Sequence, residues 1–314
     1  MSCHFITWKI MQQRRLSYSL LTFLFLLSLL FSLSGCAPTP PGDSAEIVLP
    51  EKWSNDFKRV SEESELEVCI KVVDLTTGVE AAFQSDHRMP AASMIKLLIA
   101  ETFLQQVSHG MHSLDDMYTL REYDIVGGAG SLSLRGAGTQ VPKSDLLQKM
   151  ITESDNVAAN VLLDLCGMDA VNREAERLGL RETILDRHFM DTNAMEQGHD
   201  NYTCADDIAF LLSMIYEKSF VNEKMSNLML SCLEAQKDNE GISNGLPQNI
   251  IFAHKTGTLR TVHHDGGIVE AEKPFIIVVL CGGERFRNDA ALEVMRKIGE
   301  TVYRDLQMPT KAGV

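Results

Sequence analysis

Basic residues are scarce in this chain. Its 314 residues include 29 Lys and Arg against 43 Asp and Glu, which gives a formal net charge of −14 at pH 7. A protein that binds nucleic acid needs a basic surface for the phosphates, so the charge argues against such a partner. We expect the acidity to serve solubility. With 45% hydrophobic and 23% charged residues, and with no repeats after residue 42, the composition is that of a globular protein.

Paired cysteines and metal-binding motifs are also lacking. Of seven cysteines, Cys3 and Cys36 lie near the N-terminus, and the other five show no C-x-x-C spacing. An odd number forbids a complete set of disulfides, so we predict that most of these are small buried hydrophobic residues. His109 and His112 have no carboxylate placed as a third ligand, and H-E-x-x-H is absent, so no metal site is predicted. The five cysteines are Cys69, Cys166, Cys204, Cys232 and Cys281.

Long hydrophobic runs are absent except at residues 16–33, which follow Arg14 and Arg15. A basic segment before an apolar one is typical of a signal peptide. Residues 33–36 resemble a bacterial lipobox, which implies that Cys36 is lipidated. We therefore predict a lipoprotein signal peptide at 1–35, a proline-rich tether at 36–50 and an extracytoplasmic, membrane-anchored bacterial lipoprotein. The alternative is an uncleaved anchor, because the 18 residues of the run nearly span a bilayer.

The predicted folded part, residues 51–310, has strand patterns at both ends and helix patterns between them. Strands at both ends imply an α+β fold, in which distant segments form one sheet and a helical lobe at about 108–248 is inserted. A cleft between two lobes is a usual place for a functional site. Hydrophobic periodicity predicts strands at 66–75, 79–83, 250–259, 264–270 and 274–281. It predicts helices at 51–62, 92–107, 143–151, 156–165, 170–178, 205–216, 222–235 and 288–306.

Residues 93–96, Ser-Met-Ile-Lys, are the first of three short motifs. The predicted helix around them is apolar on nearly every side, so it should be buried. A buried lysine is costly unless it is paired or functional, and Ser93 lies one turn from Lys96 on the same face. A perturbed lysine can take the proton of a serine nucleophile, and the helix N-terminus offers N–H groups to an oxyanion. The alternative is a helix cap followed by a lysine that extends to solvent.

Two further motifs follow in order along the chain. Residues 154–156, Ser-Asp-Asn, lie between two predicted helices, where they could serve only to cap the second helix. Residues 255–257, Lys-Thr-Gly, lie in a predicted strand, where the alternative is an edge-strand lysine with a glycine bulge. A glycine in a strand also lets a ligand or another backbone approach closely. The period of two puts Lys255 and Gly257 on one face and Thr256 on the other.

Together the three motifs resemble the S-x-x-K, S-D-N and K-T-G set of class A β-lactamases and penicillin-binding proteins. The segments 151–160 and 254–259 around two of the motifs are also similar to the family, and the resemblance covers roughly residues 50–307. It implies a β-lactamase-like fold with an antiparallel sheet and an all-helical lobe. It also implies an acyl-enzyme mechanism without a cofactor, acting on a β-lactam or a peptidoglycan peptide.

The resemblance assigns catalytic and binding roles to the first two motifs. Ser93 is the nucleophile that becomes acylated, and Lys96 is its base. Ser154 passes the proton to the leaving nitrogen, and Asn156 holds the amide of the substrate's side chain.

The third motif supplies the remaining residues of the implied site. Lys255 and Thr256 bind the carboxylate of the substrate, and Lys255 also perturbs Lys96. Gly257 lines the site, and the amide of Thr258 forms the oxyanion hole together with that of Ser93.

One part of the family's pattern is missing. Class A enzymes carry a glutamate in the Ω-loop that activates the deacylating water. Residues 185–193 resemble the start of this loop, but the glutamate position falls on Phe189. Asp191 is the nearest carboxylate, and it is either a substitute base or a structural acid. If a salt bridge between Arg187 and Asp200 closes the loop, the loop is shorter than in the family.

We therefore predict a monomeric serine hydrolase of the class A β-lactamase type that β-lactams acylate and that hydrolyses them, slowly if the base is missing. The alternatives are a penicillin-binding or D,D-peptidase-like enzyme on peptidoglycan and a non-catalytic cell-wall-binding lipoprotein. The intact catalytic motifs argue against the last, because a dead site has no reason to keep them together. Residues 241–245 match the G-x-S-x-G motif of α/β-hydrolases, but a polar loop precedes them and Pro247 follows, so we interpret them as a turn.

Overall fold

The structure is a computed structural model that describes residues 48–308. The predicted signal peptide, most of the predicted tether and the lipidation site Cys36 lie outside the described residues. Within residues 48–308, none of the helices combines the length and the hydrophobicity that a membrane span needs.

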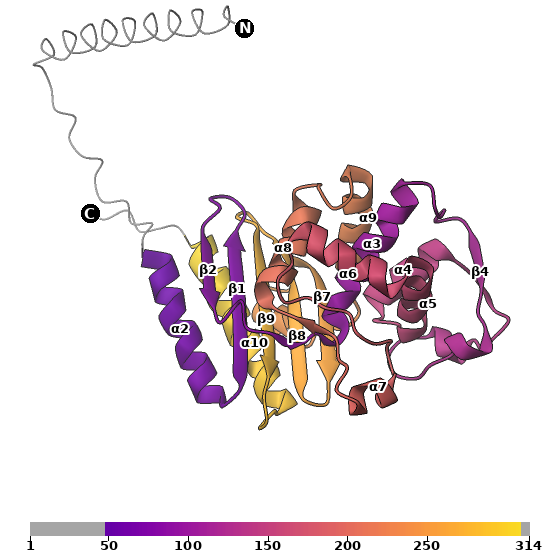
Figure 1. Ribbon diagram of the computed structural model, residues 1–314. Helices are drawn as coiled ribbons and strands as arrows, with labels where there is room; N and C mark the ends of the chain where they lie inside the picture. The colour runs from indigo at the N-terminus through magenta and orange to yellow at the C-terminus, as the bar shows by residue number, and fades with distance from the viewer. Residues whose placement is uncertain (1–47, 309–314) are drawn as a thin grey trace, which may run out of the picture. The chain divides into compact units, whose positions relative to one another are not determined.

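A five-stranded antiparallel sheet joins the two ends of the described chain (Figure 1). Its order is β2-β1-β9-β8-β7, and β1 pairs with β9 so that Val68 lies opposite Cys281. The α+β fold with a sheet from distant segments is therefore confirmed. The strands of the sheet are β1 (Glu67–Asp74), β2 (Glu80–Phe83), β7 (Ile251–Leu259), β8 (Val262–Glu270) and β9 (Phe275–Gly282).

Two short strand pairs lie outside this sheet and were not predicted. One joins β3 (Met89–Pro90) to β6 (Tyr202–Thr203), and the other joins β4 (Met117–Thr119) to β5 (Gln140–Pro142). Two or three residues are too few to show a period of two, so the sequence pattern could not reveal them.

The helices pack on both faces of the sheet and extend beyond it on one side (Figure 1). The predicted helices are all present, with ends shifted by a few residues, and the five-residue helix α7 is additional. The helices are α2 (Val48–Ser64), α3 (Lys96–Ser108), α4 (Lys143–Thr152), α5 (Asn156–Cys166), α6 (Met168–Leu178), α7 (Thr192–Glu196), α8 (Ala205–Tyr216), α9 (Glu223–Glu234) and α10 (Asn288–Gln307).

Four 3₁₀ turns complete the described chain, and two of them bear on the predictions. The helix predicted from residue 92 begins as the 3₁₀ turn η2, and α3 follows only from Lys96. The segment 241–245 forms a turn, as predicted, and its Gly245 packs directly against the backbone of α10. The 3₁₀ turns are η2 (Ala92–Ile95), η3 (Glu122–Asp124), η4 (Leu132–Leu134) and η5 (Ile242–Gly245).

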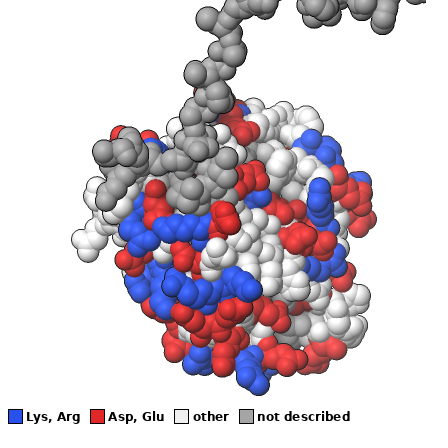
Figure 2. All heavy atoms as spheres, turned by 90° about the vertical axis from the view of Figure 1, so that its left-hand side faces the viewer, with Lys and Arg blue, Asp and Glu red and all other residues white. Residues whose placement is uncertain are grey.

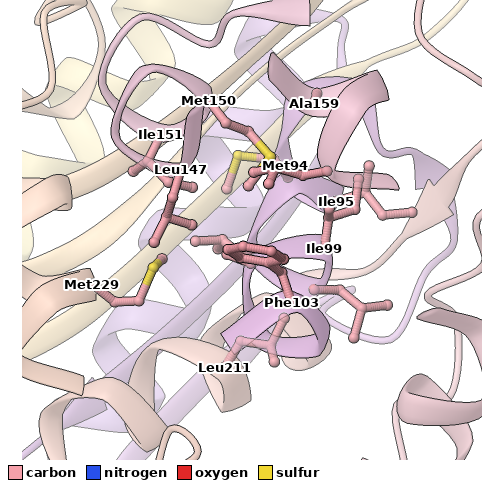
Figure 3. Packing of buried hydrophobic residues seen from close by; sticks show 14 of the residues in the cluster. Met94, Ile95, Ile99, Phe103, Leu147, Met150, Ile151, Ala159, Leu211 and Met229 are labelled. Carbon is pink, nitrogen blue, oxygen red and sulfur yellow. The ribbon is translucent and has the colours of Figure 1, made fainter. Parts of the chain in front are cut away.

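The two faces of the sheet bury separate hydrophobic clusters. On one face, Trp53 and Phe57 of α2 join side chains of α10 and of the sheet. On the other face, α3 lies at the centre of the larger cluster, and Figure 3 shows Phe103 of α3 among side chains of α4, α5, α8 and α9. The five cysteines of the described chain are all free and buried, which confirms the prediction that most of them are small buried hydrophobic residues.

The face that carries α2 is covered with charged side chains of both signs (Figure 2). Many of them pair over short distances, such as Arg59 with Asp56 at 2.9 Å and Lys52 with Asp305 at 2.7 Å. Exposed ion pairs contribute little to stability, and the expectation that the charge serves solubility stays a prediction.

Candidate active site

The hydroxyl of Ser93 is presented by a sharp turn at the start of the buried helix. Ala92 has φ of +47°, a left-handed conformation that a residue with a Cβ adopts at a cost of about 1–2 kcal/mol. The amide of Met94 donates to the carbonyl of Ala91 at 3.0 Å and closes the turn. Ala92, Met94 and Ile95 are buried while Ser93 stays partly exposed, so the nucleophile is fixed and still accessible.

Lys96 is fully buried beneath this turn. Its Nζ donates to the carbonyl oxygen of Ser154 at 2.6 Å and to Oδ1 of Asn156 at 2.9 Å. Burial, and secondly the charge of Lys255, hold the pKa of Lys96 well below its usual range. A neutral amine has two N–H donors and one lone pair. In that neutral form the two short bonds would use both donors, and the lone pair would be left to accept a proton from a hydroxyl.

The ring of Phe189 lies over the same amine, with the Lys96 Nζ 4.4 Å from its centroid. An aromatic face stabilises an ammonium group, so the ring favours the protonated Lys96 that proton transfer creates. The backbone of Phe189 is held by Asn160, whose Oδ1 accepts from its N–H at 2.8 Å and whose Nδ2 donates to its carbonyl at 3.0 Å. A fixed phenyl ring therefore lies beside Lys96, at the residue to which the sequence resemblance assigns the family's glutamate position.

Ser154 joins the two buried lysines. Its Oγ lies 3.0 Å from the Nζ of Lys255 and 3.4 Å from the Nζ of Lys96. Burial lowers the pKa of Lys255 to about 7, against the opposing effect of Asp238 and Asp265. A hydroxyl between two amines with lowered pKa values can pass a proton between them and a substrate.

The middle residue of the second motif has the structural role that was considered as an alternative. Asp155 is the N-cap of α5, and its carboxylate accepts from the amides of Ala158 at 2.9 Å and Leu132 at 2.8 Å. The cap fixes the start of α5, so the same turn that begins the helix aims Ser154 and Asn156 at Lys96. The capping interpretation is confirmed for Asp155, and the functional roles of Ser154 and Asn156 stay predictions.

The glycine of the third motif permits a close approach. A Cβ on Gly257 would lie 3.0 Å from the amide nitrogen of Ser93 and 3.2 Å from the Cβ of Ala92. Strand β7 can therefore lie directly against the nucleophile's turn. Lys255 and Gly257 share the face toward η2, as the period of two predicted, and Lys255 is buried although β7 is an edge strand.

Two cavities meet at Ser93. One, of about 290 Å³, is also lined by Asn156, Phe189 and Asp191. The other, of about 380 Å³, is also lined by Ser154 and Thr256. Ser93, Ala129 and Thr258 line both, so a substrate that spans the two cavities places its reacting bond beside the serine.

The loop of residues 185–201 closes as predicted. The Nη2 of Arg187 lies 2.8 Å from Oδ1 of Asp200, which forms the expected salt bridge. Asp191 is exposed and accepts from the amide of Ala194 at 2.9 Å, which makes it the N-cap of α7. The capping bond gives Asp191 a structural role. Because it also lines the cavity beside Ser93, its role as a base remains a prediction.

The glycine-rich segment 127–130 was not predicted as part of the site. The carbonyl of Gly127 accepts from Nδ2 of Asn156 at 3.2 Å. The carbonyl of Ala129 accepts from the backbone amide of Asn156 at 3.0 Å. Gly128 lies against the same side chain with φ of +85°, where a Cβ would clash. Three glycines in four residues were the available signal, because such a run marks a backbone that approaches a neighbour closely.

Every predicted site residue in the described chain lies in this cleft or directly behind it. Among residues 48–308, no group of three or more His, Cys, Asp or Glu side chains is arranged to hold a metal ion. A partly exposed serine, a buried lysine with a lowered pKa and a second serine bonded to two lysines are the groups that a serine hydrolase with a lysine base requires.

Comparison with known proteins agrees with this class. The sequence profile of the beta-lactamase enzyme family matches residues 52–306, so the chain belongs to that family. A β-lactamase of Bacillus licheniformis is 25% identical over 295 residues, which are 90% of this chain and 95% of that protein. The protein is therefore a serine hydrolase of the class A β-lactamase type.

Solved structures show the same fold. A β-lactamase from Sphaerobacter thermophilus superposes with a TM-score of 0.76 and 26% identity, over 82% of this chain and 99% of that one. A mutant of PBP-A in an acyl-enzyme complex with penicillin G superposes with a TM-score of 0.76 and 24% identity, over 86% of this chain and 99% of that one.

Proposed function

We propose that β-lactams acylate this protein at Ser93 and that the acyl group leaves slowly. The observation that carries the proposal is the environment of Lys96. Burial lowers the pKa of Lys96, whose Nζ donates to Ser154 and Asn156, and a phenyl ring lies 4.4 Å from it at the residue to which the family resemblance assigns the hydrolytic glutamate. Such a site favours proton transfer from Ser93 over activation of water.

Acylation needs only groups that the cleft contains. The lone pair of Lys96 takes the proton of Ser93, and the Oγ attacks the lactam carbonyl carbon. The amides of Ser93 and Thr258 stabilise the oxyanion. When the C–N bond breaks, the proton passes from Lys96 through Ser154 to the lactam nitrogen, and the ester at Ser93 remains.

Deacylation needs a base that removes a proton from water. General-base assistance is typically worth roughly 10²–10⁴ in rate. The ring of Phe189 cannot accept a proton, and the carboxylate of Asp191 is exposed and bonded to Ala194. We therefore expect the acyl-enzyme to accumulate, with a burst of β-lactam opening followed by slow turnover.

A second candidate is a penicillin-binding or D,D-peptidase-like enzyme that acts on peptidoglycan. It would use the same acylation at Ser93, and Phe189 favours it because an apolar ring suits a site whose main task is not β-lactam hydrolysis. The discriminating assay is release of the terminal residue from a peptide ending in D-alanyl-D-alanine, compared with the rate of β-lactam turnover in the same preparation.

The site is tested by intact-mass spectrometry after mixing with benzylpenicillin. Wild type should gain one penicillin adduct, and Ser93→Ala should gain none. Ser243→Ala is the matched control, because Ser243 is the serine of the rival G-x-S-x-G segment and should be dispensable. An adduct that persists in Ser93→Ala, or that disappears in Ser243→Ala, contradicts the proposal. Stopped-flow absorbance with a chromogenic cephalosporin then measures the burst.

We also propose that the enzyme is an extracytoplasmic lipoprotein, anchored through Cys36. The proposal is supported by the residues 33–36 and by the apolar run before them. Metabolic labelling with a palmitate analogue should be lost in Cys36→Ser. Label retained in that variant would place the acyl chain elsewhere or indicate that residues 16–33 remain as an anchor.

A further inference from the structure

A histidine in the central part of β8 is bonded to the segment that leads to the nucleophile. His264 lies opposite Gly257 in the register of β7 and β8, and its side chain is fully buried. Its Nε2 lies 2.8 Å from the carbonyl oxygen of Pro90, which is three residues before Ser93 and 174 residues away along the chain. This contact joins the sheet to the entry of the nucleophile's turn.

The partner atom fixes the state of the ring. A carbonyl oxygen only accepts, so Nε2 must carry the proton. Burial lowers the pKa of His264 to about 4, and the neighbouring His263 acts in the same direction, so the ring stays neutral at physiological pH. A neutral ring has one N–H, which leaves Nδ1 as an acceptor, and among the described residues Nδ1 has no hydrogen-bond partner. Because a buried unpaired acceptor is unfavourable, packing alone does not account for a histidine here.

The segment that follows this bond, residues 91–93, is strained and lies in close contact with β7. Ala92 has a left-handed backbone, which persists only where surrounding contacts determine it. Two bonds hold the peptide group that leads into it: His264 bonds the carbonyl of Pro90, and the amide of Ala91 donates to the carbonyl of Asn201 at 2.7 Å. The amide of Ser93 then meets β7 at Gly257, where a Cβ would lie only 3.0 Å from the amide nitrogen.

We propose that His264 is a positioning residue for acylation: its Nε2–H holds the Pro90 carbonyl and thereby sets the Ser93 hydroxyl and amide against β7. The inference rests on the proposed acylation at Ser93 and adds a residue outside the three motifs. It predicts that loss of the donor slows acylation, since a shift of about 1 Å in a reacting group can cost roughly 10² in rate.

The test compares three variants by the rate of benzylpenicillin acylation, followed by intact mass. His264→Leu removes the donor and should slow acylation by roughly a hundredfold. His264→Gln carries an N–H the same number of bonds from Cα as Nε2, and it should restore most of the rate. His263→Leu is the matched control, because His263 is the adjacent buried histidine of β8 and bonds Asn288 at 2.7 Å instead. It should acylate as wild type does.

Two results would overturn the inference. One is wild-type acylation in folded His264→Leu, and the other is an equal loss in His263→Leu, which would indicate a merely structural effect.

A readout that needs no reaction separates this inference from the proposed function. Amide hydrogen exchange at Ala91 and Met94 should accelerate in His264→Leu and return toward wild type in His264→Gln. If wild type forms no adduct, the proposed function fails, and the exchange data alone decide the positioning role. If His264→Leu does not fold, ¹⁵N NMR of wild type decides it: a proton on Nε2 supports the bond to Pro90, and a proton on Nδ1 refutes it.

Discussion

The two sides of Ser93 offer different chemistry. On the side of α5 and β7, Lys96, Ser154 and Lys255 form a buried chain of donors and acceptors with contacts of 2.6–3.4 Å. On the side of the 185–201 loop, the ring of Phe189 faces the same lysine, and the nearest loop carboxylate, Asp191, caps a short helix. The groups proposed for acylation and the position assigned to water activation are therefore separate features of the fold, and an apolar ring lies at the second.

The largest expected effect is on the polar side. Lys96→Ala should reduce the rate of benzylpenicillin acylation by at least roughly 10³, because Lys96 is the proposed base for Ser93. The fold should survive, since removing the buried amine also removes the cost of burying it. Circular dichroism and intact mass measure the two outcomes. An adduct formed at the wild-type rate would assign the base to another residue.

The second largest effect is expected on deacylation when the apolar Phe189 is replaced. Phe189→Glu places a carboxylate near Lys96 and should accelerate deacylation by roughly 10². The same charge should raise the pKa of Lys96 and slow acylation. Phe189→Gln is the matched control, with similar size and no charge. Stopped-flow absorbance separates the burst from the steady rate, and equal deacylation in both variants would show that the position does not control water.

The pH dependence of kcat/KM tests the proposed role of Lys255. With a pKa of about 7, Lys255 loses its charge as pH rises through 7, so kcat/KM for an anionic penicillin should fall by up to roughly tenfold per pH unit above it. A penicillin esterified at its carboxylate should lack this fall. In the unfolded chain the lysine binds its proton up to its ordinary pKa of 10.5. The contribution of Lys255 to the free energy of unfolding therefore rises between about pH 7 and 10.5. If kcat/KM for the esterified penicillin falls equally at alkaline pH, Lys255 is excluded as the partner of the substrate's carboxylate.

A smaller effect concerns stability, away from the cleft. Glu101 is fully buried in α3, and burial together with Glu174 raises its pKa to about 8. The folded protein therefore holds a proton that the unfolded chain releases above pH 4.5, so stability falls as pH rises from 4.5 to 8. Glu101→Gln should be more stable than wild type by roughly 1–3 kcal/mol at pH 8 and equal at pH 4.5. Urea unfolding measures both, and an advantage independent of pH would refute this cause.

The smallest expected effect is at Asp191. Asparagine caps a helix as well as aspartate does, so Asp191→Asn should keep α7 and remove only the charge. Because the carboxylate is exposed and bonded to Ala194, deacylation should stay at the wild-type rate. A trapped acyl-enzyme in this variant would identify Asp191 as the base and end the contrast between the two sides.

The sequence predicted the long elements because their hydrophobic patterns are long enough to show a period. The helices α2 to α6 and α8 to α10 and the five sheet strands follow from it, and the buried lysine of α3 followed from the apolar residues around it. Three motifs that recur in one family then linked residues 93, 154 and 255. In the structure Ser154 lies within hydrogen-bonding distance of Lys96 and Lys255, and Ser93 lines the cavity beside Ser154.

Tertiary structure alone decided how these pieces meet. The pairs β3–β6 and β4–β5 are too short to show a pattern, and no local signal announces the left-handed Ala92. The ring of Phe189 lies over Lys96, and His264 bonds Pro90, which is 174 positions away along the chain. Both contacts join residues that are far apart in the sequence. Composition and periodicity report which face of an element is buried. Which atoms touch there depends on how distant elements pack, and that packing determines both the low pKa of Lys96 and the placement of Ser93.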